Sequence, residues 1–152
     1  MLLSIPELTL PSTHGDIALA DLRGTPFVLF FYPRDDTPGC TTENIDFTAL
    51  MGDFDTIGVK LFGVSKDTLE KHKKFMDKKA LRVPLLSDAQ TNLCEHMGVW
   101  TQKQMFGKAY MGIARSTFLF GVDGTVYQEW RKVKVPGHAA DVLQAAQQLT
   151  GA

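Results

Sequence analysis

FVLFFYPRDDTPGC, residues Phe27–Cys40, is the stretch that decides the fold. It opens with Phe27–Tyr32, an unbroken apolar and aromatic run that is typical of a strand buried on both faces rather than of a helix. Pro33 ends this run, and residues 34–39, which are polar and rich in proline and glycine, predict a turn. Cys40 closes that turn.

A helix is predicted directly after Cys40. Apolar residues follow at the i, i+3, i+4 and i+7 spacing of one helical face, namely Phe47, Leu50, Met51 and Phe54. Cys40 should therefore lie in the first turn of a helix at the carboxyl end of a central strand, where chemistry collects in open α/β sheets. The unpaired N–H groups of a helix N-terminus favour a thiolate, so we interpret Cys40 as an activated nucleophile. The alternative is a small core hydrophobe, which is common for free cysteines.

Outside this stretch, strand patterns alternate with helix patterns. Strands are predicted at residues 59–64, 84–87, 116–122 and 126–133, and helices from Cys40 to about 55, from 67, over 88–97 and over 138–149. An N-terminal β-hairpin is expected from 7–13 and 17–22, whereas 102–114 has no clean period and is predicted to be a loop. Strands alternating with helices, followed by a closing hairpin, predict an α/β domain.

Composition and charge narrow the function classes. A chain of 152 residues, 44% hydrophobic and 22% charged, has the balance of a soluble globular protein, and we predict one domain over 1–152. The formal net charge of -1 gives no electrostatic footprint for nucleic acid or for a membrane surface. The apolar runs are too short to span a bilayer, and we identify no secretory signal. Two cysteines without such a signal and without a C-x-x-C spacing predict a cytoplasmic protein with neither a zinc site nor a thioredoxin-type dithiol.

Two strings resemble a known enzyme family. Pro33, Thr37 and Cys40 read P-x-x-x-T-x-x-C, and the longer string FFYPRDDTPGCTTE resembles a peroxiredoxin, in particular the bacterioferritin-comigratory (PrxQ) branch. ARSTFLFGVDGTVYQEWRKVKVPGH, residues 114–138, is similar to the carboxyl half of that branch, so the resemblance covers essentially the whole chain. It implies a thioredoxin-like fold, with a central mixed sheet flanked by helices, and a thiol-dependent peroxidase that needs neither cofactor nor metal.

The resemblance also implies roles for individual residues. The Cys40 thiolate would attack one peroxide oxygen, leaving a sulfenic acid and releasing water or an alcohol. The hydroxyl of Thr37 would hydrogen-bond the thiolate and the substrate, and Pro33 would shield the site from water. Arg115 would supply a fixed cation, the alternative being a surface arginine at a strand edge. Glu43 would either orient Arg115 or simply favour the helix N-terminus.

The second step of the reaction departs from the family pattern. Many PrxQ-type proteins carry a resolving cysteine five residues after the first or on the next helix, and these places hold Ile45 and Met76 here. Cys94 is the remaining thiol, and on the apolar face of its predicted helix it is expected to be a buried core residue. We therefore expect a one-Cys enzyme whose sulfenic acid is resolved by an external thiol such as thioredoxin, glutaredoxin or a low-molecular-weight thiol. Resolution by Cys94 after local unfolding is the alternative.

The remaining candidates are interpreted as structural. His72 is expected to be a partly covered helix residue rather than a ligand, and Asp35 and Asp36 to belong to a solvated loop rather than to a paired-carboxylate site. Core or loop anchors are expected at Trp100, Phe106, Tyr110 and Trp130, with the 102–114 loop bordering the pocket.

Two other function classes are weighed against the peroxidase. A thiol–disulfide exchange protein on the same fold is disfavoured by the missing C-x-x-C spacing. A non-catalytic binding module would tolerate loss of Thr37, Cys40 and Arg115, and the sequence keeps all three. Near-neutral charge and the PrxQ resemblance favour a monomer.

Overall fold

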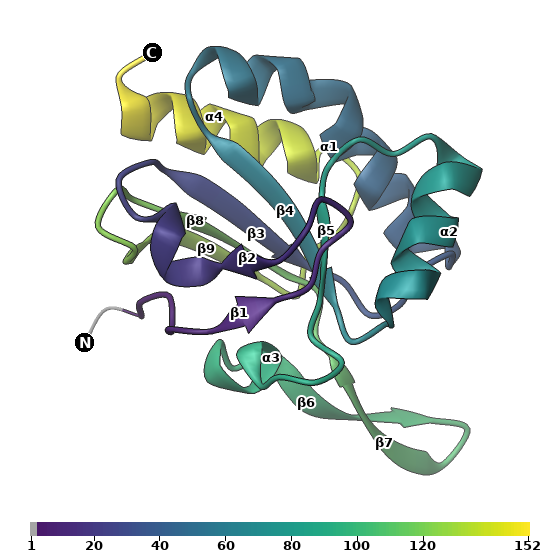
Figure 1. Ribbon diagram of the computed structural model, residues 1–152. Coiled ribbons are helices and arrows are strands. Elements are labelled where there is room, and N and C mark those ends of the chain that lie inside the picture. The colour runs from purple at the N-terminus through teal and green to yellow at the C-terminus, as the bar shows by residue number, and fades with distance from the viewer. Residues whose placement is uncertain (1–2) are drawn as a thin grey trace.

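A five-stranded mixed sheet forms the centre of the molecule, in the strand order β5-β4-β3-β8-β9 (Figure 1). The computed structural model describes residues 3–152. The strands are β3 (Phe27–Phe31), β4 (Lys60–Ser65), β5 (Leu85–Ser87), β8 (Ser116–Phe120) and β9 (Val126–Arg131). β3, β4 and β5 run parallel; on the other side of β3, β8 pairs antiparallel with β3 and β9 pairs antiparallel with β8. The predicted thioredoxin-like fold with a mixed sheet is confirmed.

The two faces of the sheet are covered by different elements (Figure 1). One face packs against the helices α1 (Pro38–Thr56), α2 (Leu69–Lys79) and α4 (His138–Thr150). The other is covered by the hairpin β1 (Thr9–Leu10) and β2 (Ile17–Ala18), the 3-10 helix η1 (Leu19–Leu22) and α3 (Leu93–His96). The predicted N-terminal hairpin is therefore confirmed. Among the helices of residues 3–152, none is both long enough and apolar enough to cross a bilayer.

The side chains of β3 alternate between these two faces. Val28 and Phe30 pack under the helices, while Phe27, Leu29 and Phe31 pack in the opposite core. The ring of Phe30 stacks on that of Phe47 in α1 with 4.3 Å between centroids, and Phe27 stacks on Phe120 in β8 at 4.5 Å. Because both faces are filled, the strand reads as a continuous apolar run, and its carboxyl end is firmly placed.

β6 (Trp100–Met105) and β7 (Lys108–Ile113) form an antiparallel hairpin that projects from the body of the molecule (Figure 1). The prediction of a loop over 102–114 is therefore wrong. Phe106 and Gly107 make the turn, both with positive φ, of 52° and 77°. Most of the hairpin is exposed, so it leaves no alternation of apolar and polar residues in the sequence.

Candidate active site

Cys40 lies in the first turn of α1, where the sequence predicted it. α1 begins at Pro38, whose missing N–H and fixed φ suit the first helical position, and Thr37 is the N-cap residue. The turn that leads into the helix starts where β3 ends, so the sheet brings the thiol to the carboxyl end of its central strand. Cys40 is 1% exposed, and the helix N-terminus around it favours negative charge.

Arg115 reaches Cys40 from the neighbouring strand. It immediately precedes β8, whose antiparallel register with β3 brings it beside the end of that strand. Its Nη2 donates to the Sγ of Cys40 at 3.3 Å, and its Nη1 donates to Oε1 of Glu43 at 2.7 Å. Gly39 leaves room for this approach, because a Cβ there would lie 3.2 Å from Nη2 of Arg115, closer than an ordinary van der Waals contact. Three of the predicted site residues are therefore joined by direct hydrogen bonds.

Burial and charge act against each other in this group. Burial raises the pKa of Glu43 to about 7, since the residue is 1% exposed and the charge of Arg115 only partly offsets the loss of solvent. Burial alone disfavours the cation of Arg115, but Glu43 and Cys40 outweigh it and raise the pKa of the guanidinium above its usual range. Among the described residues Oε2 of Glu43 has no hydrogen-bond partner, so Arg115 is what holds this carboxyl group.

Thr37 and Pro33, which belong to the turn between β3 and α1, line an open groove. The groove has a volume of about 430 Å³, and its opposite wall is formed by the β6–β7 hairpin. The hydroxyl of Thr37 donates to the backbone carbonyl of Arg34 at 3.0 Å. A hydroxyl has one hydrogen, so what Thr37 offers to a ligand is its lone pairs.

Comparison with known protein families identifies the family of this chain. The model described as the AhpC/TSA family matches residues 3–129. The chain is a peroxiredoxin of the AhpC/TSA family. Peroxiredoxin Bcp of Xanthomonas campestris pv. campestris is 45% identical over 148 residues, which is 91% of this chain and 92% of that protein. Peroxiredoxin Bcp of Bacillus subtilis is 46% identical over 146 residues, which is 95% of this chain and 93% of that protein.

Solved structures agree with these relatives. A structure of peroxiredoxin Q from Xanthomonas campestris superposes with a TM-score of 0.91 at 44% identity, over 97% of each chain. The bacterioferritin comigratory protein of the same species, described for alkyl peroxide reduction activity, superposes with a TM-score of 0.91 at 43% identity, over 97% of this chain and 98% of that one. The resemblance to the bacterioferritin-comigratory (PrxQ) branch of peroxiredoxins is confirmed.

The second cysteine of this peroxiredoxin lies in the opposite core. Cys94 is 0% exposed and packs on the face of the sheet covered by α3, whereas Cys40 packs on the face covered by α1. Burial, followed by the nearby carboxylate of Asp88, raises the pKa of the Cys94 thiol far above its usual range. The prediction that Cys94 is a buried core residue is confirmed.

Two predictions in the reactive turn and on α2 are wrong. Asp35 is 3% exposed rather than solvated, because its side chain turns inward and accepts hydrogen bonds from Tyr32 and His72. His72 is 0% exposed rather than partly covered. Asp36 diverges from Asp35 as predicted, because it is exposed and pairs with Lys78 at 2.7 Å. The sequence did carry a signal for the burial of His72, because His72 and Phe75 are three residues apart and share the buried face of α2.

The predicted aromatic anchors divide into two groups. Trp100 and Trp130 are half-buried, and Trp100 lines the groove that contains Pro33 and Thr37. Phe106 is 97% exposed and Tyr110 is 43% exposed, so the prediction that they are anchors is wrong. Both belong to the projecting hairpin, which has no core of its own to cover them. Residues of 102–114 line the groove together with Pro33 and Thr37.

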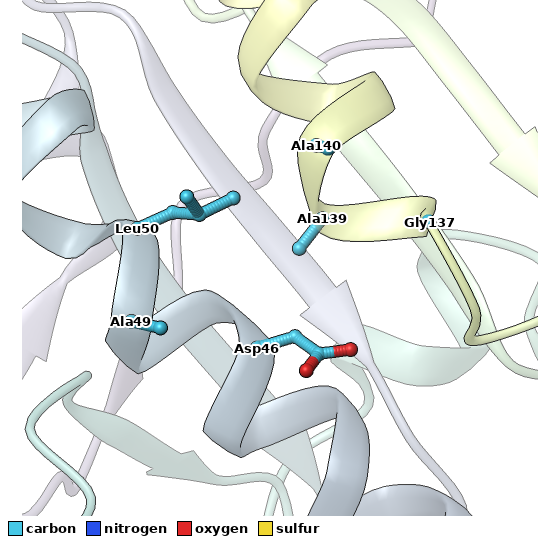
Figure 2. A pocket seen from close by; sticks show the side chains of 6 residues that line it. All are labelled: Asp46, Ala49, Leu50, Gly137, Ala139 and Ala140. Carbon is cyan, nitrogen blue, oxygen red and sulfur yellow. The ribbon is translucent and has the colours of Figure 1, made fainter.

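A second hollow, of about 310 Å³, lies between α1 and α4 (Figure 2). Small side chains line most of it, and the carboxylate of Asp46 points from α1 toward the start of α4. Burial raises the pKa of that carboxyl group. The lining of this hollow includes none of the predicted site residues, whereas Pro33 and Thr37 line the groove beside the β6–β7 hairpin.

Proposed function

We propose that this peroxiredoxin reduces hydrogen peroxide and organic hydroperoxides through a sulfenic acid at Cys40. The observation that carries the proposal is the 3.3 Å contact from Nη2 of Arg115 to the buried sulfur in the first turn of α1. The thiolate attacks one peroxide oxygen as the O–O bond breaks. The leaving oxygen takes a proton and departs as water or an alcohol, and Cys40 keeps the other oxygen as a sulfenic acid.

Four side chains support this step around Cys40. The cation of Arg115 stabilises the thiolate and the charge that moves onto the leaving oxygen. Thr37 has its hydrogen committed to Arg34, so its lone pairs accept the hydrogen of the peroxide and orient it. Pro33 covers the groove against water, and Glu43 fixes the direction of Arg115 through the 2.7 Å hydrogen bond.

The groove supports organic hydroperoxides as substrates beside hydrogen peroxide. Apolar side chains of the β6–β7 hairpin, including Met105, Tyr110 and Met111, line the wall opposite Pro33 and Thr37. An alkyl group that enters with its peroxide end toward Cys40 would lie against them. The alkyl peroxide reduction activity described for the similar Xanthomonas campestris protein supports the same substrate class.

An external thiol is the proposed reductant of the sulfenic acid. Cys40 and Cys94 belong to cores on opposite faces of the sheet, and a disulfide needs their Cα atoms within about 7 Å. Thioredoxin, glutaredoxin or a low-molecular-weight thiol would instead supply the sulfur that attacks the sulfenic acid. The protein would act as a monomer in the reducing cytoplasm. Resolution by Cys94 would require both segments to unfold locally.

The test is peroxide consumption in the presence of dithiothreitol or thioredoxin. Cys40→Ser is expected to abolish turnover, while Cys94→Ser is expected to retain it within about twofold, as for a buried residue away from the reaction. Peptide mass mapping after one equivalent of peroxide should find sulfenic acid at Cys40. Undiminished turnover of Cys40→Ser would overturn the nucleophile assignment. A Cys40–Cys94 disulfide with loss of turnover in Cys94→Ser would overturn the one-Cys mechanism.

A further inference from the structure

A buried hydrogen-bond network holds the turn between β3 and α1 from its inner side. At its centre is Asp35, whose side chain is 1% exposed. The hydroxyl of Tyr32 donates to Oδ1 of Asp35 at 2.6 Å, and Nδ1 of His72 donates to Oδ2 at 2.6 Å. The backbone N–H of Asp35 donates to Oδ2 of Asp67 at 2.8 Å. Both carboxylate oxygens and the N–H of Asp35 are thereby bound to neighbouring elements.

The partners of Asp35 come from the ends of the parallel strands and from α2. Tyr32 directly follows β3, Asp67 follows β4, and His72 lies on α2. Nε2 of His72 faces the carbonyl oxygen of Leu86 in β5 at 2.9 Å. Both ring nitrogens of His72 are thereby engaged by hydrogen-bond partners. The network therefore ties the turn to the ends of β3, β4 and β5 through Tyr32, Asp67 and His72.

The turn held in this way is the one that carries Thr37. The carbonyl that accepts the hydroxyl hydrogen of Thr37 belongs to Arg34, the residue directly before Asp35. Asp36, directly after it, has a φ of 62°, in the left-handed region that a residue with a side chain adopts at a cost. Such a conformation persists where the surrounding structure imposes it. Fixing Asp35 thus fixes the Arg34 carbonyl and, through it, the direction of the lone pairs of Thr37.

We infer that Tyr32, Asp35 and His72 are positioning residues for peroxide reduction that act through Thr37. The inference rests on the proposed function, since the direction of this hydroxyl matters when a peroxide binds beside the sulfur. Small misplacements of a catalytic group slow a reaction strongly. The cation beside the sulfur comes instead from Arg115 before β8. Loosening the turn should therefore slow peroxide reduction and leave the thiolate in place.

The experiment compares two reactions of the same sulfur in single turnover. Tyr32→Phe removes one donor but keeps the ring, and Asp35→Asn keeps the shape but not the charge. Lys78→Gln is the matched control, because it breaks the exposed ion pair of Asp36 on the outer side of the same turn. For each protein we would measure the rate of oxidation by hydrogen peroxide and the rate of iodoacetamide alkylation, read on the Cys40 peptide by mass spectrometry.

A selective loss is expected. Oxidation should slow about tenfold in Tyr32→Phe and about a hundredfold in Asp35→Asn, with alkylation within about twofold of wild type in both. Lys78→Gln should match wild type in both reactions. Unchanged oxidation in Tyr32→Phe and Asp35→Asn, or oxidation and alkylation that fall together, would overturn the positioning role. If wild type and Lys78→Gln oxidise no faster than Cys94 in the same chain, the proposed function itself fails.

A double-mutant cycle tests the route through Thr37. In a Thr37→Val background, which lacks the hydroxyl, Asp35→Asn should slow oxidation by less than about twofold further. A full additional loss would mean that Asp35 acts by another route and would overturn the inference. Near-UV circular dichroism would show whether each variant is folded. Tyr32→Phe retains the packing of the ring and carries the test if Asp35→Asn fails to fold.

Discussion

Replacing Glu43 by glutamine is expected to remove a pH-dependent loss of stability that the wild-type protein carries. Burial raises the pKa of Glu43 from its ordinary value of 4.5 to about 7. Between these two values the folded protein keeps a proton that the unfolded chain has lost. The free energy of unfolding therefore falls as the pH rises through this window. The stabilisation that comes from the bound proton of Glu43 is fully present below the pKa of the unfolded chain and is lost above the pKa of the folded protein.

The magnitude follows from the two pKa values. The pKa of Glu43 rises from 4.5 in the unfolded chain to about 7 in the folded protein, and each pKa unit corresponds to about 1.4 kcal/mol. As the pH rises through this window, the free energy of unfolding of the wild type should therefore fall by about 3 kcal/mol relative to that of the variant. Glu43 is 1% exposed, so screening by solvent does not reduce the effect. Burial lowers the pKa of His138 from 6.5 to about 4, so the contribution of His138 to the free energy of unfolding rises with pH instead of falling. His138 is present in both proteins, so its contribution cancels in the difference.

Urea unfolding of the two proteins, followed by circular dichroism from about pH 4.5 to about pH 8, measures this difference directly. The wild-type value minus the Glu43→Gln value should fall by about 3 kcal/mol across the range. A difference that stays constant within about 0.5 kcal/mol, or that rises with pH, would refute the reasoning. It would mean that the charge of Arg115 offsets the burial of Glu43 completely.

Three further substitutions test the site. Arg115→Met should slow oxidation of Cys40 by peroxide by about two to three orders of magnitude, as when one charge-stabilising donor is removed, and stopped-flow measurement of peroxide loss would detect it. Gly39→Ala adds a Cβ 3.2 Å from Nη2 of Arg115 and should slow the same reaction about tenfold, and an unchanged rate would show that the guanidinium can shift freely. Met111→Gln should slow reduction of cumene hydroperoxide about threefold while hydrogen peroxide is reduced at the wild-type rate, and equal effects on both would argue against an alkyl site in the groove.

The position of Cys40 could be predicted because its causes are local. The apolar run of β3, the turn residues after it and the helical spacing within α1 all lie within one short stretch of chain. Each element also needs only its own pattern to be recognised. The contact of Arg115 with the sulfur is different, since it depends on the register of β8 against β3. The family resemblance supplied that expectation, and the roles of Thr37, Pro33 and Glu43 remain predictions.

The errors have causes that the sequence does not carry locally. A hairpin such as β6–β7, exposed on most of its surface, shows no apolar alternation and is specified by backbone pairing and by the positive φ of Phe106 and Gly107. Asp35 is buried because Tyr32 and His72 supply donors to it, and His72 is 37 residues away. A polar residue in a turn is solvated unless such partners exist. Their meeting depends on how α2 packs on the sheet.

Two buried polar pairs therefore flank the reactive stretch: the ion pair of Glu43 with Arg115 near the sulfur, and the hydrogen-bonded pair of Asp35 with His72 behind the turn. A buried ion pair often adds no net stability compared with apolar residues of the same size, because desolvation offsets the attraction. What such pairs provide is direction, since hydrogen bonds between charged groups are short and geometrically demanding. An apolar core could hold the sheet and helices together equally well. It could not fix a guanidinium against one sulfur and a hydroxyl against one carbonyl, and the proposed reduction of peroxide at Cys40 needs both directions at once.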